Sequence, residues 1–228
     1  MPKLARECLR SWRRYLPEYE LREWNEDNFN LERYPYAKEA YESRKFAFVT
    51  DVVRMYALYH EGGVYMDMDV EILKPLDAFL HHNAVSGFES ENRYPTGLMA
   101  AEKGSLWAKH NLDWYEGRHF IRANGEPDLT PNVDIIMEVT ERHAAMRRDN
   151  TFQDIPGYVT IYPQDYFSPS NWQTKEINLT ERTVCIHHFA GSWKPKTPLH
   201  IRLKRRMKTH FPRLSAFLSF VLSRHSGR

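Results

Sequence analysis

The sequence predicts an α/β domain in which a mixed sheet lies between helices. Two observations predict this class. Segments with apolar residues at helical spacing alternate with short runs rich in β-branched and aromatic residues. Hydrophobic residues make up 42% of the 228 positions, which is enough for one sizeable core. No internal repeat or low-complexity linker interrupts the pattern, so we expect one domain with at most a subdomain.

The first part of the chain is expected to alternate between helix and strand. Residues 2–19 place apolar side chains on one helical face, and residues 19–24 alternate as a short strand does. Two helical stretches fill residues 36–61. They end at Gly62-Gly63, because glycine tolerates the left-handed conformation of a helix cap. Residues 64–73 follow as a strand rich in β-branched and aromatic side chains.

The later part of the chain is expected to continue this alternation. Its helices are predicted at residues 105–117 and 131–146, the second capped by Thr130 or Asn132. Its strands are predicted at residues 83–89, 157–163 and 182–190.

Charge is unevenly distributed along the chain. The net charge is +2, but residues 1–181 carry −9 and residues 182–228 carry +11 with no acidic residue. Such asymmetry suggests a tail that meets phosphates or a membrane surface, and a solvated basic tail is the alternative.

Cysteine content and hydropathy exclude several classes of protein. Two cysteines give no disulfide framework and no cysteine-rich zinc site, so a reducing, cytoplasmic setting is expected. The sequence contains no secretory leader and no apolar run long enough to span a bilayer.

Asp67 and Asp69 are two acidic residues within an otherwise apolar predicted strand. Residues i and i+2 of a strand face the same side, so the two carboxylates are expected to project together. Carboxylates that close together repel unless a divalent cation lies between them, and Mg²⁺ and Mn²⁺ prefer such oxygen ligands. The alternative is a sheet edge with both aspartates in water.

Asp51 and Arg54 are the only charged residues between Lys45 and Glu61. They are three positions apart, so they share a helix face and can pair. One interpretation is a buried ion pair that fixes the helix to the sheet. The other is a polar pair at the same pocket edge as the aspartates, hydrogen-bonding sugar hydroxyls.

The stretch FVTDVVRMYALYHEGGVYMDMDVEILKPLD, residues 48–77, resembles the DXD block of a nucleotide-sugar glycosyltransferase family. Relatives in that family are the yeast initiation-specific α-1,6-mannosyltransferases, bacterial capsular polysaccharide glycosyltransferases and, more distantly, the glucosylating clostridial toxins. The shared pattern runs S/T-D-x-x-R and then G-G-x-Y-x-D-x-D. Residues 11–29 and 186–196 are also similar to this family.

The resemblance implies a glycosyltransferase-A type domain with a metal at the strand ends. Asp51 and Arg54 would bind hydroxyls of the donor sugar, and Tyr65 would shape the donor pocket. Asp67 would bridge the donor and the metal, and Asp69 would bind Mn²⁺ or Mg²⁺ directly. Asp67, Asp69 and Arg54 are therefore the expected catalytic residues.

The stretch HHFAGSWKPK, residues 187–196, resembles the closing loop of retaining galactosyltransferases and glycogenin-like enzymes. A neutral imidazole is a good ligand for Mn²⁺ beside carboxylates. The resemblance implies His188 as the metal ligand, with His187 on the opposite strand face as its substitute. Ser192, Trp193 and Lys194 would cover and contact the donor diphosphate.

Further positions carry weaker expectations. Glu89 and Asn132 lie where an acceptor or a sugar hydroxyl could contact the pocket. Members of the family usually begin with a strand that is not found in this sequence, so the sheet is expected to lack its usual first strand.

The expected organisation is a catalytic domain over residues 1–197 and a basic amphipathic tail over residues 198–228. The tail, through residues 200–228, could bring the protein to the cytoplasmic face of a membrane.

The expected function is metal-dependent transfer of a hexose from a nucleoside-diphosphate sugar, with UDP-sugars favoured, to a glycan or lipid-linked saccharide. The resemblance implies retention of anomeric configuration and a role in polysaccharide or capsule biosynthesis. No side chain is assigned as a general base, and no nucleic-acid partner is expected. Two alternatives are a catalytically silent remnant that binds a glycan or a partner, and a nucleotide-sugar hydrolase.

Overall fold

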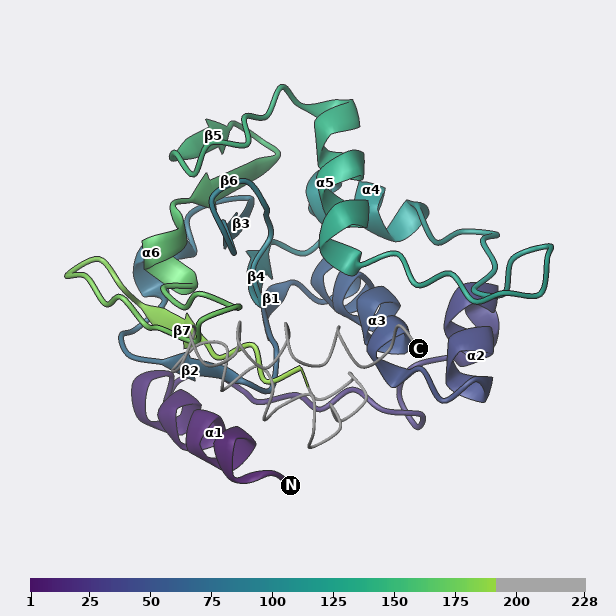
Figure 1. Cartoon of the computed structure of the whole chain (residues 1–228), viewed down its shortest axis with the longest axis horizontal. Helices are drawn as coiled ribbons and strands as arrows, with labels where there is room; N and C mark the ends of the chain where they lie inside the picture. Colours follow the sequence, from purple (N-terminus) through teal and green to yellow (C-terminus); the bar gives the residue numbers. More distant parts are fainter. Residues whose placement is uncertain (192–228) are drawn as a thin grey trace, which may run out of the picture. The chain divides into compact units, whose positions relative to one another are not determined.

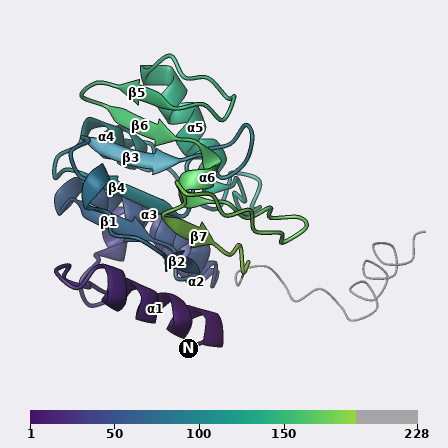
Figure 2. The same cartoon turned by 90° about the vertical axis from the view of Figure 1, so that its left-hand side faces the viewer.

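The sheet at the centre of the molecule has five strands in the order β1-β4-β3-β6-β5. The computed structural model describes residues 1–191. The strands of this sheet are β1 (Gly63–Met66), β3 (Ala84–Gly87), β4 (Leu98–Ala101), β5 (Gln153–Ile155) and β6 (Val159–Tyr162). β3 and β6 run parallel and the other neighbours run antiparallel, so the sheet is mixed, as predicted. Figure 2 shows the five strands stacked in this order.

Two further strands, β2 (Val70–Ile72) and β7 (Cys185–His187), form a separate antiparallel pair. The register places Val70 opposite His187 and Ile72 opposite Cys185. This pair joins a residue that follows the Asp-x-Asp motif to a segment more than a hundred positions later in the chain.

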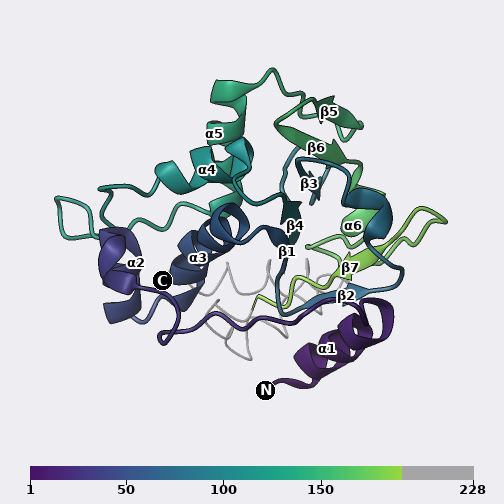
Figure 3. The same ribbon diagram turned by 180° about the vertical axis from the view of Figure 1, so that it is seen from behind.

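Helices cover both faces of the five-stranded sheet (Figures 1 and 3). One face carries the helices that the sequence predicts between residues 36 and 146; the other carries α1 and α6. The longer helices are α1 (Lys3–Tyr15), α2 (Pro35–Glu42), α3 (Phe46–His60), α4 (Leu106–Asp113) and α5 (Asn132–His143). The short ones are α6 (Gln164–Phe167) and the 3₁₀ turns η1 (Leu31–Arg33) and η2 (Asp77–Phe79).

Alternation along the strands divides the core into two hydrophobic clusters. In β4, Met99 and Ala101 belong to the cluster under α2–α5, whereas Leu98 and Ala100 belong to the cluster under α1. Successive residues of a strand point to opposite faces, so one strand serves both clusters. The result is a three-layer α/β/α domain, as the sequence predicts. Residues Met1–Ala190 form one compact unit.

Three local predictions are wrong. Residues 19–24 form no strand. Most of their side chains are exposed, with Leu21 56% exposed, so the segment has no buried apolar face that would stabilise it in a sheet. The strand predicted over residues 64–73 is broken into β1 and β2 by a turn at the aspartates. Helix α5 begins after Pro131 rather than after a side-chain cap, and Asn132 instead donates to the Tyr115 hydroxyl at 3.0 Å.

β1 lies at one edge of the sheet, and its side chains are at most partly buried. The expected lack of a first strand stays a prediction.

Among the described residues, no helix is long and apolar enough to cross a membrane.

Candidate functional site

The Asp-x-Asp motif occupies the turn between β1 and β2. The Asp67 N–H donates to the Gly97 carbonyl at 2.8 Å, and the Val70 N–H donates back to the Asp67 carbonyl at 3.0 Å. The first bond continues the pairing of β1 with β4, and the second closes the turn. The carboxylates of Asp67 and Asp69 therefore converge because the chain bends between them, not because they share a face of one strand.

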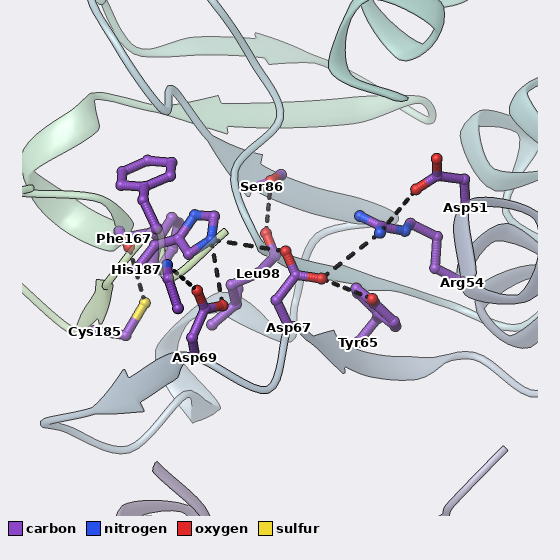
Figure 4. Close-up of polar contacts among 12 residues, drawn as sticks. Asp51, Arg54, Tyr65, Asp67, Asp69, Ser86, Leu98, Phe167, Cys185 and His187 are labelled. Carbon is purple, nitrogen blue, oxygen red and sulfur yellow. Dashed lines mark hydrogen bonds and ion pairs between the residues drawn. The ribbon is translucent and has the colours of Figure 1, made fainter. Parts of the chain in front are cut away.

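His187, at the end of β7, faces both aspartates (Figure 4). Its Nε2 atom lies 3.5 Å from Asp69 Oδ1 and 3.7 Å from Asp67 Oδ2. One ligand atom from each of the three side chains lies within 4.8 Å of the other two. The three could hold one metal ion between them.

The histidine that lies beside the aspartates is not the one that the sequence favours as a metal ligand. His188, the preferred ligand from sequence, points to the other side of β7, where its Nε2 lies 2.9 Å from Glu71 Oε2. The cause is strand alternation combined with the register of β7 on β2, which sets Val70 opposite His187. His187, named as the substitute, is the histidine beside the aspartates.

Asp51 and Arg54 form the predicted pair on α3, which confirms the inference from their spacing. Arg54 Nη2 lies 2.9 Å from Asp51 Oδ1 and 3.6 Å from Asp67 Oδ1. The guanidinium also lies over the Tyr65 ring, 4.7 Å from its centroid, and the Tyr65 hydroxyl donates to Asp67 Oδ1 at 2.7 Å. Figure 4 shows Asp51 and Arg54 on one side of Asp67, and Asp69 and His187 on the other.

The carboxylate and imidazole at the centre stabilise each other's charged forms. Burial alone would raise the pKa of Asp69, but contact with His187 and a 2.7 Å hydrogen bond from the Ala190 N–H outweigh it, so that the pKa is lowered. Burial alone would lower the pKa of His187, but the nearby carboxylates of Asp69 and Asp67 raise it. The two carboxylates therefore favour the protonated form of the His187 imidazole.

Burial dominates the electrostatics at the edges of the site. It raises the pKa of Asp51 to about 7, although Arg54 opposes the shift and Asp67 adds to it. It also raises the pKa of Glu89, against the opposing charges of His187 and Arg93. The carboxylates of Asp51 and Glu89 are therefore costly to keep ionised without a further positive charge.

Gly97 is part of the site although no sequence motif singled it out. A Cβ at this position would lie 2.9 Å from Asp67 Oδ2, closer than real Cβ atoms come, and 3.0 Å from His187 Cε1, which is tighter than most Cβ contacts. The side chains of Asp67 and His187 thus leave little room for a side chain at position 97.

The structure places the two weaker candidates differently. The Glu89 carboxylate lies near the site, close enough for His187 to affect its pKa, and Arg93 Nε is 3.4 Å from Glu89 Oε1. Asn132 contacts Tyr115 and has no direct contact with the aspartates among the contacts of the described part of the chain. Ser192, Trp193 and Lys194 lie outside the described residues, so their donor contacts stay predictions.

The donor atoms fit a hard divalent cation. Two carboxylates and one imidazole nitrogen match the ligand preferences of Mn²⁺, and the carboxylates also suit Mg²⁺. Tyr65 and the Ala190 N–H each bond one of the aspartates, which orients the carboxylates as outer partners of metal ligands commonly do.

The fold and the site define a class. A mixed sheet between helices, with an Asp-x-Asp turn at the end of an edge strand, is the arrangement of a glycosyltransferase-A-like α/β domain. Residues 2–86 match the family model described as a glycosyltransferase sugar-binding region containing a DXD motif.

Two curated relatives share this region. The chain is 33% identical over 92 residues to inositol phosphoceramide mannosyltransferase 3 of Schizosaccharomyces pombe, a match covering 39% of this chain and 26% of the relative. It is 36% identical over 47 residues to glucan organizing enzyme 1 of Cryptococcus neoformans var. grubii, covering 21% of this chain and 13% of the relative. The chain thus spans about a quarter or less of these proteins. No solved structure gives a significant match.

Proposed function

We propose that the protein is a metal-dependent glycosyltransferase that moves a hexose from a nucleoside-diphosphate sugar to a hydroxyl of a glycan or lipid-linked saccharide. The single observation that carries this proposal is the convergence of Asp67, Asp69 and His187 within 4.8 Å. The Asp51–Arg54 pair beside them supports it, because sugar recognition needs fixed hydrogen-bonding groups next to the phosphate-binding ion.

Asp67, Asp69 and His187 would hold Mn²⁺ or Mg²⁺. When bound, such an ion neutralises the negative charge that builds up on a diphosphate leaving group. The residues of the chain do the rest by orientation and electrostatics. Arg54 contacts both Asp51 and Asp67 through Nη2 and donates from Nε to the Thr50 carbonyl at 3.3 Å, and its other N–H groups would bind donor hydroxyls.

Tyr65 stays a neutral donor, because burial raises its pKa well above the usual value. It therefore keeps one lone pair of Asp67 occupied and limits the directions in which that carboxylate can bind. With retention of configuration, an oxygen of the leaving phosphate can accept the proton of the attacking hydroxyl, so no general base is assigned.

The relatives support the choice of sugar and acceptor classes. One is named as a mannosyltransferase of inositol phosphoceramide and the other as a glucan organizing enzyme. Both names point to hexose-containing products. They favour a glycan or a lipid carrying a sugar-like headgroup as acceptor, and a role in polysaccharide biosynthesis.

A donor titration tests the proposal. Calorimetry with UDP-sugars, with and without Mn²⁺, should give metal-dependent binding, and product analysis with a saccharide acceptor should give transfer. Release of free sugar without transfer, even when a saccharide acceptor is present, would indicate a hydrolase, and binding without turnover would indicate a silent remnant.

The decisive variant is Asp69→Asn. It keeps the shape of the side chain but removes the charge, so metal-dependent turnover should fall by about 10²-fold or more with the fold intact. Asp113→Asn changes an exposed aspartate of α4 that pairs with Lys109 and should leave turnover unchanged. Full activity of Asp69→Asn would refute the assignment.

A further inference from the structure

The metal-binding side chains come from two different sheets. Asp67 is bonded to the five-stranded sheet through the Gly97 carbonyl, whereas Asp69 and His187 belong to the β2–β7 pair. The Asp69 carbonyl accepts the His188 N–H at 3.1 Å, which extends that pair by one bond. The distances between the three ligands therefore depend on where the β2–β7 pair sits against the larger sheet.

The outer edge of β2 has no neighbouring strand among the described residues, and side chains of α1 take its place. The backbone groups of residues 69, 71 and 73 point to β7, as the 2.8 Å bond from the Leu73 N–H to the Val184 carbonyl illustrates. Those of Val70 and Ile72 point the other way. There the Val70 carbonyl accepts the Trp12 Nε1–H at 2.7 Å, and the Ile72 N–H donates to Ser11 Oγ at 2.9 Å.

Both α1 residues are buried, and the Ser11 hydroxyl is also bonded within its own helix. Ser11 Oγ donates to the Cys8 carbonyl at 2.6 Å, which orients its lone pairs towards Ile72. Trp12 lies in the hydrophobic cluster with Val70, Ile72 and residues of β3 and β4. Figure 2 shows α1 alongside β2 and β7, below the stacked strands. A buried carbonyl or N–H without a partner is costly, so these two bonds fix β2 strongly.

We propose that Ser11 and Trp12 are positioning residues for the metal site: together they form an edge clamp on β2 that sets where Asp69 and His187 stand relative to Asp67. The inference rests on the proposed function, because it assumes that these three side chains bind a metal. In this proposal α1 does not contact the metal site directly and acts on it only through the backbone of β2.

The test compares two buried indoles in the full-length chain. Trp12→Phe removes the clamp's N–H and keeps an aromatic ring. Trp107→Phe removes an equivalent buried bond, the 2.9 Å donation from Trp107 Nε1 to Thr140 Oγ1 between α4 and α5. Both variants should lose stability, but only Trp12→Phe should weaken Mn²⁺ binding, by roughly 10-fold, the low end for outer partners of metal ligands. Mn²⁺ affinity is read by electron paramagnetic resonance, without donor or turnover.

Two further measurements separate positioning from general loosening. Ser11→Ala should weaken Mn²⁺ binding in the same direction, and Ser11→Thr, which keeps the hydroxyl, should restore it. Amide hydrogen exchange without metal should accelerate over residues 69–73 and 184–188 in Trp12→Phe but not in Trp107→Phe. Equal Mn²⁺ affinity in the two Trp variants would overturn the clamp. A wild-type chain that binds no Mn²⁺ would overturn the metal site itself, and the clamp with it.

Discussion

Asp67 receives contacts from three sides, and each limits a different motion of the side chain. Its backbone is bonded to Gly97, its Oδ1 accepts the Tyr65 hydroxyl and lies near Arg54, and its Oδ2 faces His187. A carboxylate held in this way can present Oδ2 to an ion and leave Oδ1 in contact with Tyr65 and Arg54. Preorganisation of this kind is what electrostatic catalysis requires.

The two adjacent histidines offer a discriminating test at the residue scale. His187→Gln should weaken Mn²⁺ binding by about 10-fold or more, because an imidazole nitrogen beside Asp67 and Asp69 is lost. His188→Gln is the matched control: it removes only the contact with Glu71 and should keep Mn²⁺ affinity within about twofold. Calorimetric titration with Mn²⁺ measures both. The opposite ranking would restore His188 as the ligand.

The residue-scale predictions from sequence differ in outcome for a physical reason. The Asp51–Arg54 pair followed from helix geometry, because positions three apart must be neighbours on one face. The choice between His187 and His188 depended on strand register, which is set by pairing with a distant segment. Gly97 gave no signal, because its role arises from side chains that approach it from two other elements.

At the scale of elements, the helices followed from their periodicity and several strands did not. β4 has the sequence LMAA, which contains no β-branched or aromatic residue, and it is nevertheless the strand that pairs with both β1 and β3. Burial on both sheet faces, not local propensity, makes this segment a strand. The break between β1 and β2 at Asp67–Asp69 could not be predicted from the sequence, because the residues on both sides of it are good strand formers.

A stacked histidine pair joins α4 to α5 and predicts a pH dependence of stability. The rings of His110 and His143 lie 3.8 Å apart between centroids with planes at 19°. His110 Nδ1 is 3.3 Å from the Tyr158 hydroxyl. Burial lowers the pKa of His110, the nearby His143 and Lys109 lower it further, and Asp113 opposes them.

The sign follows from linkage. Because the pKa of His110 is lower folded than unfolded, the unfolded chain binds more protons below about pH 6.5, and stability is lost as the pH falls through that window. His110→Gln should therefore flatten the fall in melting temperature between about pH 7 and pH 5, measured by calorimetry. An equally steep fall in the variant would show that this pair is not responsible.

At the scale of the whole molecule, charge is segregated along the chain. The 181 residues up to Glu181 carry −9, and the rest carry +11. Most of that basic segment lies outside the described residues, including the predicted boundary at residue 197 and the predicted tail at 198–228. Its membrane role, and with it a cytoplasmic-face location, is therefore a proposal from sequence.

Vesicle pelleting tests that proposal. Deleting residues 200–228 removes a cluster of Lys and Arg side chains, each able to contribute about 1 kcal/mol near an anionic surface, and leaves an acidic remainder. Pelleting with vesicles containing anionic lipid should be lost on deletion, and should be absent with neutral vesicles. Undiminished pelleting of the truncated chain would rule out this segment as the membrane contact.

The split origin of the ion-binding side chains has a consequence for how the protein matures. A nascent chain that has emerged only as far as residue 86, the end of the family-matched region, already contains Asp67 and Asp69. It does not yet contain His187 or the rest of β7. If these three side chains bind the ion as proposed, tight binding must wait until synthesis has passed residue 187 and β7 has paired with β2. Such an ion would then stabilise only the completed fold, and it would not act as an early nucleus for folding.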